Sequence, residues 1–144
     1  MNRIKLAIVS LFLLSFGAVG TAVAAETATH KVVIQVSSSD PETQNLALNN
    51  VANVQQLYGM DNVTVELVAY GPGLSLLTKQ NKQSKRVESL AMQNVTFSAC
   101  GNTIKAITKK TGKKPVLTEG VRVVPGGVGR IIELQEQGYS YIRP

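Results

Sequence analysis

Cysteine, histidine and tryptophan are scarce in this chain: its 144 residues contain one Cys, one His and no Trp. A single cysteine cannot form a disulfide within its own chain, which excludes a scaffold held together by disulfides. One Cys and one His cannot supply ordinary zinc ligation. The glycine fingerprint G-x-G-x-x-G, typical of dinucleotide binding, does not follow the first predicted strand. The sequence therefore predicts neither a metal site nor a bound cofactor.

Aromatic residues are also few, at 5% of the chain, while the net charge is +6. The lysines gather in two stretches, 79–86 and 105–114. No aromatic residue lies among them to stack on bases, so nucleic acid is not an expected partner. These stretches are interpreted either as solvated surface or as a means of attracting an anionic substrate or partner.

A long apolar run occurs only near the N-terminus, over residues 6–20. Basic residues precede it, and Ala22-Val23-Ala24 after it fits an A-x-A cleavage site. The run is too short for a comfortable transmembrane helix. We therefore expect residues 1–25 to be a cleavable signal peptide, cut after Ala24 or Ala25, with an uncleaved anchor as the alternative. The expected location is the bacterial periplasm, with no stable membrane anchor after cleavage.

Residues 26–144 are expected to form one α/β domain in which strands and helices alternate. The predicted strands are residues 31–36, 63–70, 95–99, 121–124 and 139–142. The predicted helices are residues 41–58, 74–79, 86–93, 102–110 and 128–137. Such alternation implies βαβ units, a mainly parallel sheet of about five strands, and helices on both faces.

The first long helix has clear signals at both ends. Asp40 is a favourable N-cap, Pro41 suits the first helical position, and Gly59 is expected to end the helix. Its predicted core stripe has helical spacing and consists of Ala47, Val51, Val54 and Tyr58.

Ligands of open α/β sheets bind beyond the carboxyl ends of the strands. Four small or glycine-rich connections are expected there, at residues 37–40, 70–73, 100–102 and 125–129. Three of them open directly into predicted helices, whose N-termini favour anions. The candidate anion-binding residues are Gly71, Gly73, Gly101, Asn102, Gly126 and Gly127.

Cys100 is the candidate reactive residue, because it lies between a predicted strand and a predicted helix. A helix N-terminus lowers the pKa of a thiol and increases its reactive thiolate fraction. Gly101 is expected to leave the sulfur uncrowded, and Asn102 or Thr103 to cap the helix. A buried apolar thiol and an intermolecular disulfide are the alternatives. His30, the only histidine, lies near the expected mature N-terminus, which argues against a Cys–His hydrolase.

The order and spacing of several short stretches resemble the DsrE/DsrF family of sulfur-relay proteins, in its exported branch. The matching stretches are residues 33–36 with Asp40-Pro41, then 47–53, 68–74, 97–103, 123–129 and 134–144. The resemblance implies a flavodoxin-like three-layer sandwich and assembly into a homo-oligomer, either a trimer or a hexamer. It also implies a cysteine that carries sulfur as a persulfide, and that role maps onto Cys100.

Three functions follow from this reading. The chain is expected to be a periplasmic sulfur carrier that exchanges sulfur with a donor and an acceptor protein, rather than a turnover enzyme. The second hypothesis is a non-catalytic oligomeric module that binds a small anionic or nucleotide-like ligand at the glycine-rich strand ends. The third is an interaction protein whose assembly is its function.

Overall fold

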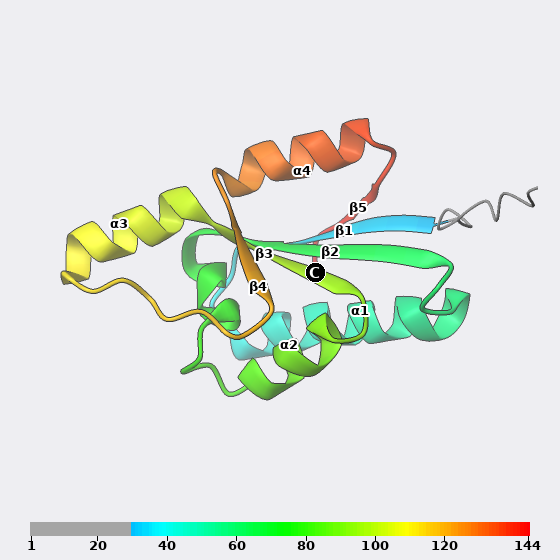
Figure 1. Ribbon diagram of the computed structural model, residues 1–144, viewed down its shortest axis with the longest axis horizontal. Helices are drawn as coiled ribbons and strands as arrows, with labels where there is room; N and C mark the ends of the chain where they lie inside the picture. Colours follow the sequence, from blue (N-terminus) through cyan, green and yellow to red (C-terminus); the bar gives the residue numbers. More distant parts are fainter. Residues whose placement is uncertain (1–29) are drawn as a thin grey trace, which may run out of the picture.

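The computed structural model describes residues 30–144 (Figure 1). The predicted signal peptide, residues 1–25, lies outside the described residues. The strands are β1 (His30–Val36), β2 (Val63–Ala69), β3 (Val95–Cys100), β4 (Val121–Val124) and β5 (Ser140–Ile142). The helices are α1 (Pro41–Tyr58), the 3-10 helix η1 (Gly71–Leu77), α2 (Ser84–Ala91), α3 (Gly101–Thr111) and α4 (Gly127–Glu136).

The five strands form one sheet in the order β4-β3-β2-β1-β5, and every neighbouring pair is parallel. This confirms the predicted α/β class and flavodoxin-like architecture. From β1 to β4 the chain steps across the sheet in one direction, and α1 and α2 cover one face (Figure 1). The step from β4 to β5 runs back across the sheet and carries α4 over the other face, as right-handed crossovers require.

The two faces of the sheet bury cores of unequal size. The larger core joins alternate strand residues such as Ile34, Leu67 and Phe97 to α1 and α2. The smaller one lies under α4 and consists of Val33, Val68, Ile131 and Leu134, with Tyr70 and Tyr139 packed against it. A single helix, α4, covers this second face. The polar side chains that β2, β3 and β4 carry on this face therefore lie beside that helix.

The ends of α1 form as predicted, but its core stripe was partly wrong. Asp40 Oδ2 accepts a hydrogen bond from the N–H of Thr43 at 2.8 Å, and Gly59 ends the helix with a φ of 85°. Tyr58 is exposed and stacks on the ring of His30, with the ring centroids 3.8 Å apart. The last turn of α1 therefore meets the first residue of β1 instead of the core.

The segment after β2 also differs from the predicted helix over 74–79. It is the 3-10 helix η1, which begins at Gly71 and ends at Leu77. The N–H of Gly73 donates to the carbonyl of Tyr70 and that of Thr78 to Ser75, the three-residue spacing that defines this tighter helix. No helix among residues 30–144 is both long and apolar enough to cross a membrane.

Candidate functional site

The carboxyl edge of the sheet brings most of the predicted site residues together. Cys100 is the last residue of β3, and Gly101 and Asn102 open α3. Gly126 is the N-cap of α4 and Gly127 its first residue. The N–H of Asn102 donates to the carbonyl of Pro125 at 3.3 Å, which ties the start of α3 to the turn before α4. Two helix N-termini therefore meet at the end of β3.

The Cys100 side chain lies at this meeting point, and the residue is only 5% exposed. Burial raises the pKa of the Cys100 thiol. Hydrogen bonding from the hydroxyl and N–H of Thr103, and from the N–H groups of Gly127 and Asn102, lowers it. The lowering effects prevail, so the pKa lies below the ordinary value of a cysteine. The site thus favours the thiolate although it is buried.

The capping expected of Asn102 or Thr103 was wrong, because α3 begins one residue earlier than predicted. Cys100 itself is the N-cap. The hydroxyl oxygen of Thr103 instead accepts a hydrogen bond from the N–H of Gly71 at 2.9 Å. Thr103 therefore links the start of η1 to the thiol.

Glycine at two of the predicted positions allows backbones to approach one another. A Cβ atom at Gly127 would lie 2.9 Å from the Cβ of Tyr70, so this glycine lets α4 start directly against the end of β2. A Cβ atom at Gly101 would lie 3.0 Å from the carbonyl oxygen of Val124. Gly101 thus fits α3 against β4.

Two further predicted glycines, Gly71 and Gly73, do not offer a free N–H to an anion. The N–H of Gly71 donates to Thr103, and that of Gly73 donates to the carbonyl of Tyr70 at 3.1 Å. Gly73 is buried against the end of β1, where a Cβ atom would overlap the carbonyl oxygen of Val36. Its role is close packing.

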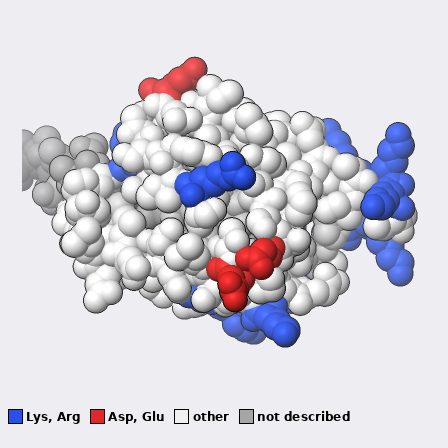
Figure 2. Space-filling view, turned by 180° about the vertical axis from the view of Figure 1, so that it is seen from behind, with Lys and Arg blue, Asp and Glu red and all other residues white. Residues whose placement is uncertain are grey.

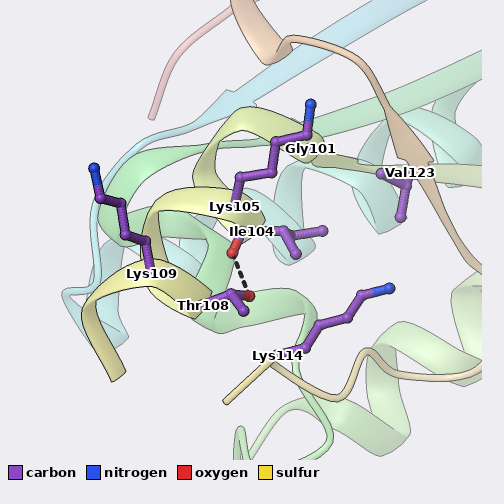
Figure 3. Close-up of a pocket in the computed structure, with 7 residues that line it drawn as sticks. All are labelled: Gly101, Ile104, Lys105, Thr108, Lys109, Lys114 and Val123. Atoms are coloured by element: carbon purple, nitrogen blue, oxygen red, sulfur yellow. Dashed lines mark hydrogen bonds between the residues drawn. The ribbon is translucent and has the colours of Figure 1, made fainter. Parts of the chain in front are cut away.

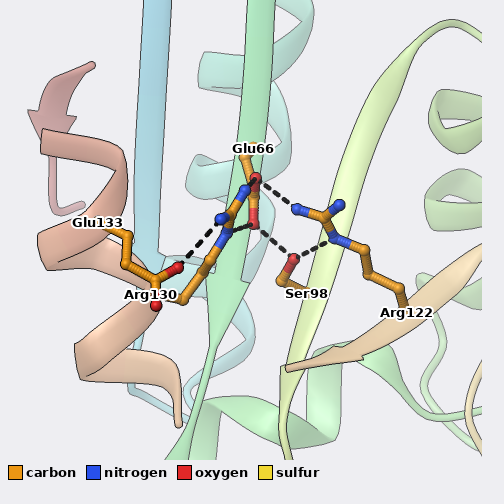
Figure 4. A network of polar contacts seen from close by, with 5 residues as sticks. All are labelled: Glu66, Ser98, Arg122, Arg130 and Glu133. Carbon is orange, nitrogen blue, oxygen red and sulfur yellow. Dashed lines mark hydrogen bonds and ion pairs between the residues drawn. The ribbon is translucent and has the colours of Figure 1, made fainter. Parts of the chain in front are cut away.

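An ionic network around the buried carboxylate of Glu66 lies on the same face of the sheet as the Cys100 side chain, and the sequence analysis did not predict it. Figure 4 shows the five residues of this network. Glu66 of β2 is 2% exposed and accepts two hydrogen bonds from Arg130 of α4, both at 2.9 Å. It also accepts hydrogen bonds from Ser98 at 2.6 Å and from Arg122 at 2.7 Å. Arg130 further donates to Glu133 at 3.1 Å, and Arg122 to Ser98 at 3.0 Å.

This network ties the first turn of α4 to three strands. Burial raises the pKa of Glu66, but hydrogen bonds from Arg130, Ser98 and Arg122 hold it below its usual range. Ser98 lies two residues before Cys100 on β3, so both side chains share one face of the sheet. Because Arg130 follows Gly127 by three residues, its pairing with Glu66 helps to hold the N–H of Gly127 near the sulfur. The signal available in the sequence was a single carboxylate inside a strand that is otherwise mostly apolar.

His30 lies at the opposite edge of the sheet from Cys100. It is the first residue of β1 and pairs in register with Val63, the first residue of β2. The structure thus provides no histidine base beside the thiol within residues 30–144. In the same residues, no group of three or more His, Cys, Asp or Glu side chains could hold a metal ion.

Comparison with known proteins identifies the family. A model of the DsrE/DsrF-like family matches residues 30–144, which include every strand and helix described above. No curated protein matches the sequence.

Two solved structures share the fold. The protein of unknown function MTH1491 from Methanobacterium thermoautotrophicum is 36% identical, with a TM-score of 0.72 over 80% of this chain and 99% of its own. The ychN protein from E. coli is 15% identical, with a TM-score of 0.63 over 80% of this chain and 99% of its own. The second likeness concerns the fold alone.

Proposed function

Because the chain belongs to the DsrE/DsrF-like family, we propose that it is a sulfur-relay protein that carries sulfane sulfur as a persulfide on Cys100. Family membership suggests sulfur relay in general. The observation that supports a role for this residue is the convergence of two helix N-termini on its thiol, which lowers the thiol pKa. A thiolate is the form of cysteine that attacks sulfur.

Loading requires no external oxidant when thiosulfate is the donor. The Cys100 thiolate attacks the sulfane sulfur and forms a new S–S bond, while the old S–S bond breaks and its electron pair leaves with sulfite. The product is a persulfide anion on Cys100. Polysulfide or a donor protein persulfide would react in the same way, with a shorter polysulfide or a thiolate as the leaving group.

The chain's own groups suit both the thiolate and the persulfide. The N–H groups of Asn102, Thr103 and Gly127 stabilise negative charge on sulfur, and the dipoles of α3 and α4 add to this effect. In unloading, the thiolate of an acceptor protein attacks the terminal sulfur and releases the Cys100 thiolate. The protein is thus a carrier that acts once per encounter, with donor and acceptor proteins as partners, and not a turnover enzyme.

Cyanide tests this proposal, because it removes sulfane sulfur from a persulfide as thiocyanate and leaves the thiolate. The protein would be incubated with thiosulfate, desalted and treated with cyanide, with Cys100→Ser in parallel. We expect about one thiocyanate per chain from the native protein and none from the variant. Equal thiocyanate from both proteins would contradict a persulfide on Cys100.

A second function is favoured by one observation: Cys100 is nearly inaccessible. In this alternative the thiol is only packed, and the starts of α3 and α4 bind a small anionic or nucleotide-like ligand in a non-catalytic oligomeric module. Ligand-dependent thermal stabilisation with phosphate or AMP distinguishes the two functions. If Cys100→Ser keeps the stabilisation and the native protein gains no sulfur, the binding module is the better account.

We also propose that the chain forms a homo-oligomer, a trimer or a hexamer. The outer face of α4 supports this, because Val128 and Ile132 lie one turn apart and are 56% and 52% exposed. Light scattering of the native protein and of Ile132→Asp tests the proposal. A monomeric mass for the native protein at working concentration would contradict it.

Export to the periplasm is likewise a proposal, which depends on residues 1–25. Expression of the full chain in a bacterium, followed by fractionation and N-terminal sequencing, tests it. We expect a periplasmic protein that starts after Ala24 or Ala25. An intact N-terminus in the cytoplasm would contradict it.

A further inference from the structure

The helix that follows Cys100 borders a groove that the sulfur chemistry does not use. It lies between α3 and β4, has a volume of about 570 Å³ and is not lined by Cys100 (Figure 3). Its lining comes from α3, from the segment after it and from β4: Gly101, Ile104, Lys105, Thr108, Lys109, Lys114 and Val123. We call it the α3 groove. Its volume is within the range of about 300–1,000 Å³ that is common for small-ligand sites.

The inner surface of the α3 groove is apolar. Ile104 supplies a largely buried side chain from α3, and Val123 is 54% exposed although it belongs to a strand. The hydroxyl of Thr108 donates to the carbonyl of Ile104 at 2.8 Å, so its hydrogen already has a partner inside the helix (Figure 3). This surface therefore favours an apolar group over water.

The rim of the α3 groove is cationic. Lys105 and Lys109 extend from α3 in different directions, and Lys114 extends from the segment that follows α3 (Figure 3). No carboxylate lines the groove, and none of the three lysines forms an ion pair within residues 30–144. In the rear view, basic side chains gather at the end of the molecule where α3 projects (Figure 2).

Helix stability alone does not account for these lysines. A cation in the last turn of a helix is favourable because of the dipole, and this explains Lys109. Lys105 lies near the middle of α3, and Lys114 lies beyond its end. What the three share is that they line the groove.

We propose that the α3 groove binds a small amphiphilic anion, a carboxylate or sulfonate joined to an alkyl body. The alkyl body packs on Ile104 and Val123, and the anionic group lies among the ammonium groups of the rim. A second copy of this basic chain is a poorer match, because it would bring further positive charge to an unpaired cationic rim. This proposal concerns a separate site and does not depend on persulfide formation at Cys100.

Decanoate is a suitable probe, with acetate and decyltrimethylammonium as controls that lack the alkyl body and the negative charge. We expect decanoate alone to bind, by calorimetry below its micelle concentration. In amide NMR spectra of the native protein it should shift the signals of Ile104, Thr108 and Val123. Shifts confined to other parts of the chain, or equal binding of decyltrimethylammonium, would overturn the proposal.

A triple variant tests the rim: Lys105→Glu, Lys109→Glu and Lys114→Glu. We expect its affinity for decanoate to fall by about tenfold or more, because contacts to a charged group are lost and repulsion replaces them. The matched control makes the same charge change in the other lysine stretch: Lys79→Glu, Lys82→Glu and Lys85→Glu. It should bind decanoate as the native protein does.

Light scattering of both triple variants completes the test. If reversing the groove lysines leaves decanoate binding unchanged, the proposal fails. It also fails if that variant alone loses an oligomeric mass that the native protein shows, because a second copy would then cover the groove. Val123→Asp, a single change on the exposed apolar surface, should also weaken decanoate binding and leaves the buried core untouched.

Discussion

The hydroxyl of Thr103 has two contacts, and its removal affects both. Its oxygen accepts the N–H of Gly71 at 2.9 Å, and the hydroxyl lowers the pKa of the Cys100 thiol by hydrogen bonding to it. Thr103→Val keeps the shape of the side chain and deletes this group. A hydrogen bond to a charged group contributes about 1.5–3 kcal/mol. Its loss therefore lowers the thiolate fraction by about tenfold or more at pH values well below the thiol pKa.

The assay is the rate of alkylation of Cys100 by iodoacetamide as a function of pH, followed by intact mass. We expect Thr103→Val to react several-fold more slowly than the native protein well below the thiol pKa, because the smaller thiolate fraction outweighs the greater nucleophilicity of a less acidic thiolate. The difference should vanish or reverse at alkaline pH, where both thiols are fully ionised. Thr103→Ser keeps the hydroxyl and should behave as the native protein.

Thr108→Val is the matched control, because it removes a hydroxyl from the same helix whose hydrogen bond goes to Ile104. It should leave the pH profile unchanged. Thr103→Val should also lose about 1 kcal/mol or more of unfolding free energy, since the N–H of Gly71 loses its acceptor. Equal profiles for Thr103→Val and the native protein would refute the stated cause of the lowered thiol pKa.

Three further outcomes follow from the packing of the strands. Glu66→Ala should cost about 1–3 kcal/mol in urea denaturation, because it removes the hydrogen bonds of a buried carboxylate and leaves two partly exposed arginines without their partner, and no measurable loss would count against the network. Since the pKa of Glu66 is lowered in the folded state, its stabilising effect is present above the unfolded-state pKa of about 4.3 and is lost as the pH falls through the lower folded-state pKa. Glu66→Gln should lack this part of the acid dependence of unfolding, and an unchanged dependence would assign it to another group. Gly73→Ala should destabilise the fold strongly, because its Cβ would overlap Val36. Gly129→Ala, in the open first turns of α4, should instead stabilise the fold by up to about 1 kcal/mol. Thermal melts in which both variants shift the melting temperature in the same direction would contradict this packing.

Local signals explain why much of the fold could be predicted. The valine-rich strands and the Asp40-Pro41 helix start depend on neighbours within a few residues, and both are confirmed. The exposure of a residue at a helix end depends on which residues of the folded chain it contacts. Tyr58, for example, stacks on His30 at the start of β1. Similarly, η1 is a 3-10 helix in which Gly73 packs against the end of β1, and this contact between distant residues has no local signal in the sequence.

The surroundings of Cys100 could be predicted only in outline. Its place between a strand and a helix N-terminus follows from the alternation of elements. Thr103 has a partner 32 residues away, and Arg130 pairs with Glu66 across 64 residues, so neither contact has a local signal. Similarly, Lys105, Lys109 and Lys114 were visible in the sequence only as part of a basic stretch. Their place at the rim of a groove depends on how α3 and β4 lie in the fold.

The most direct test of the central proposal is the intact mass of the natively folded protein after exposure to polysulfide and then to thiosulfate, with Cys100→Ser in parallel. The account predicts a gain of one or more sulfur atoms that reductant removes and that the variant lacks. A gain that occurs only after unfolding would contradict it, because the thiol would then be a packed structural residue.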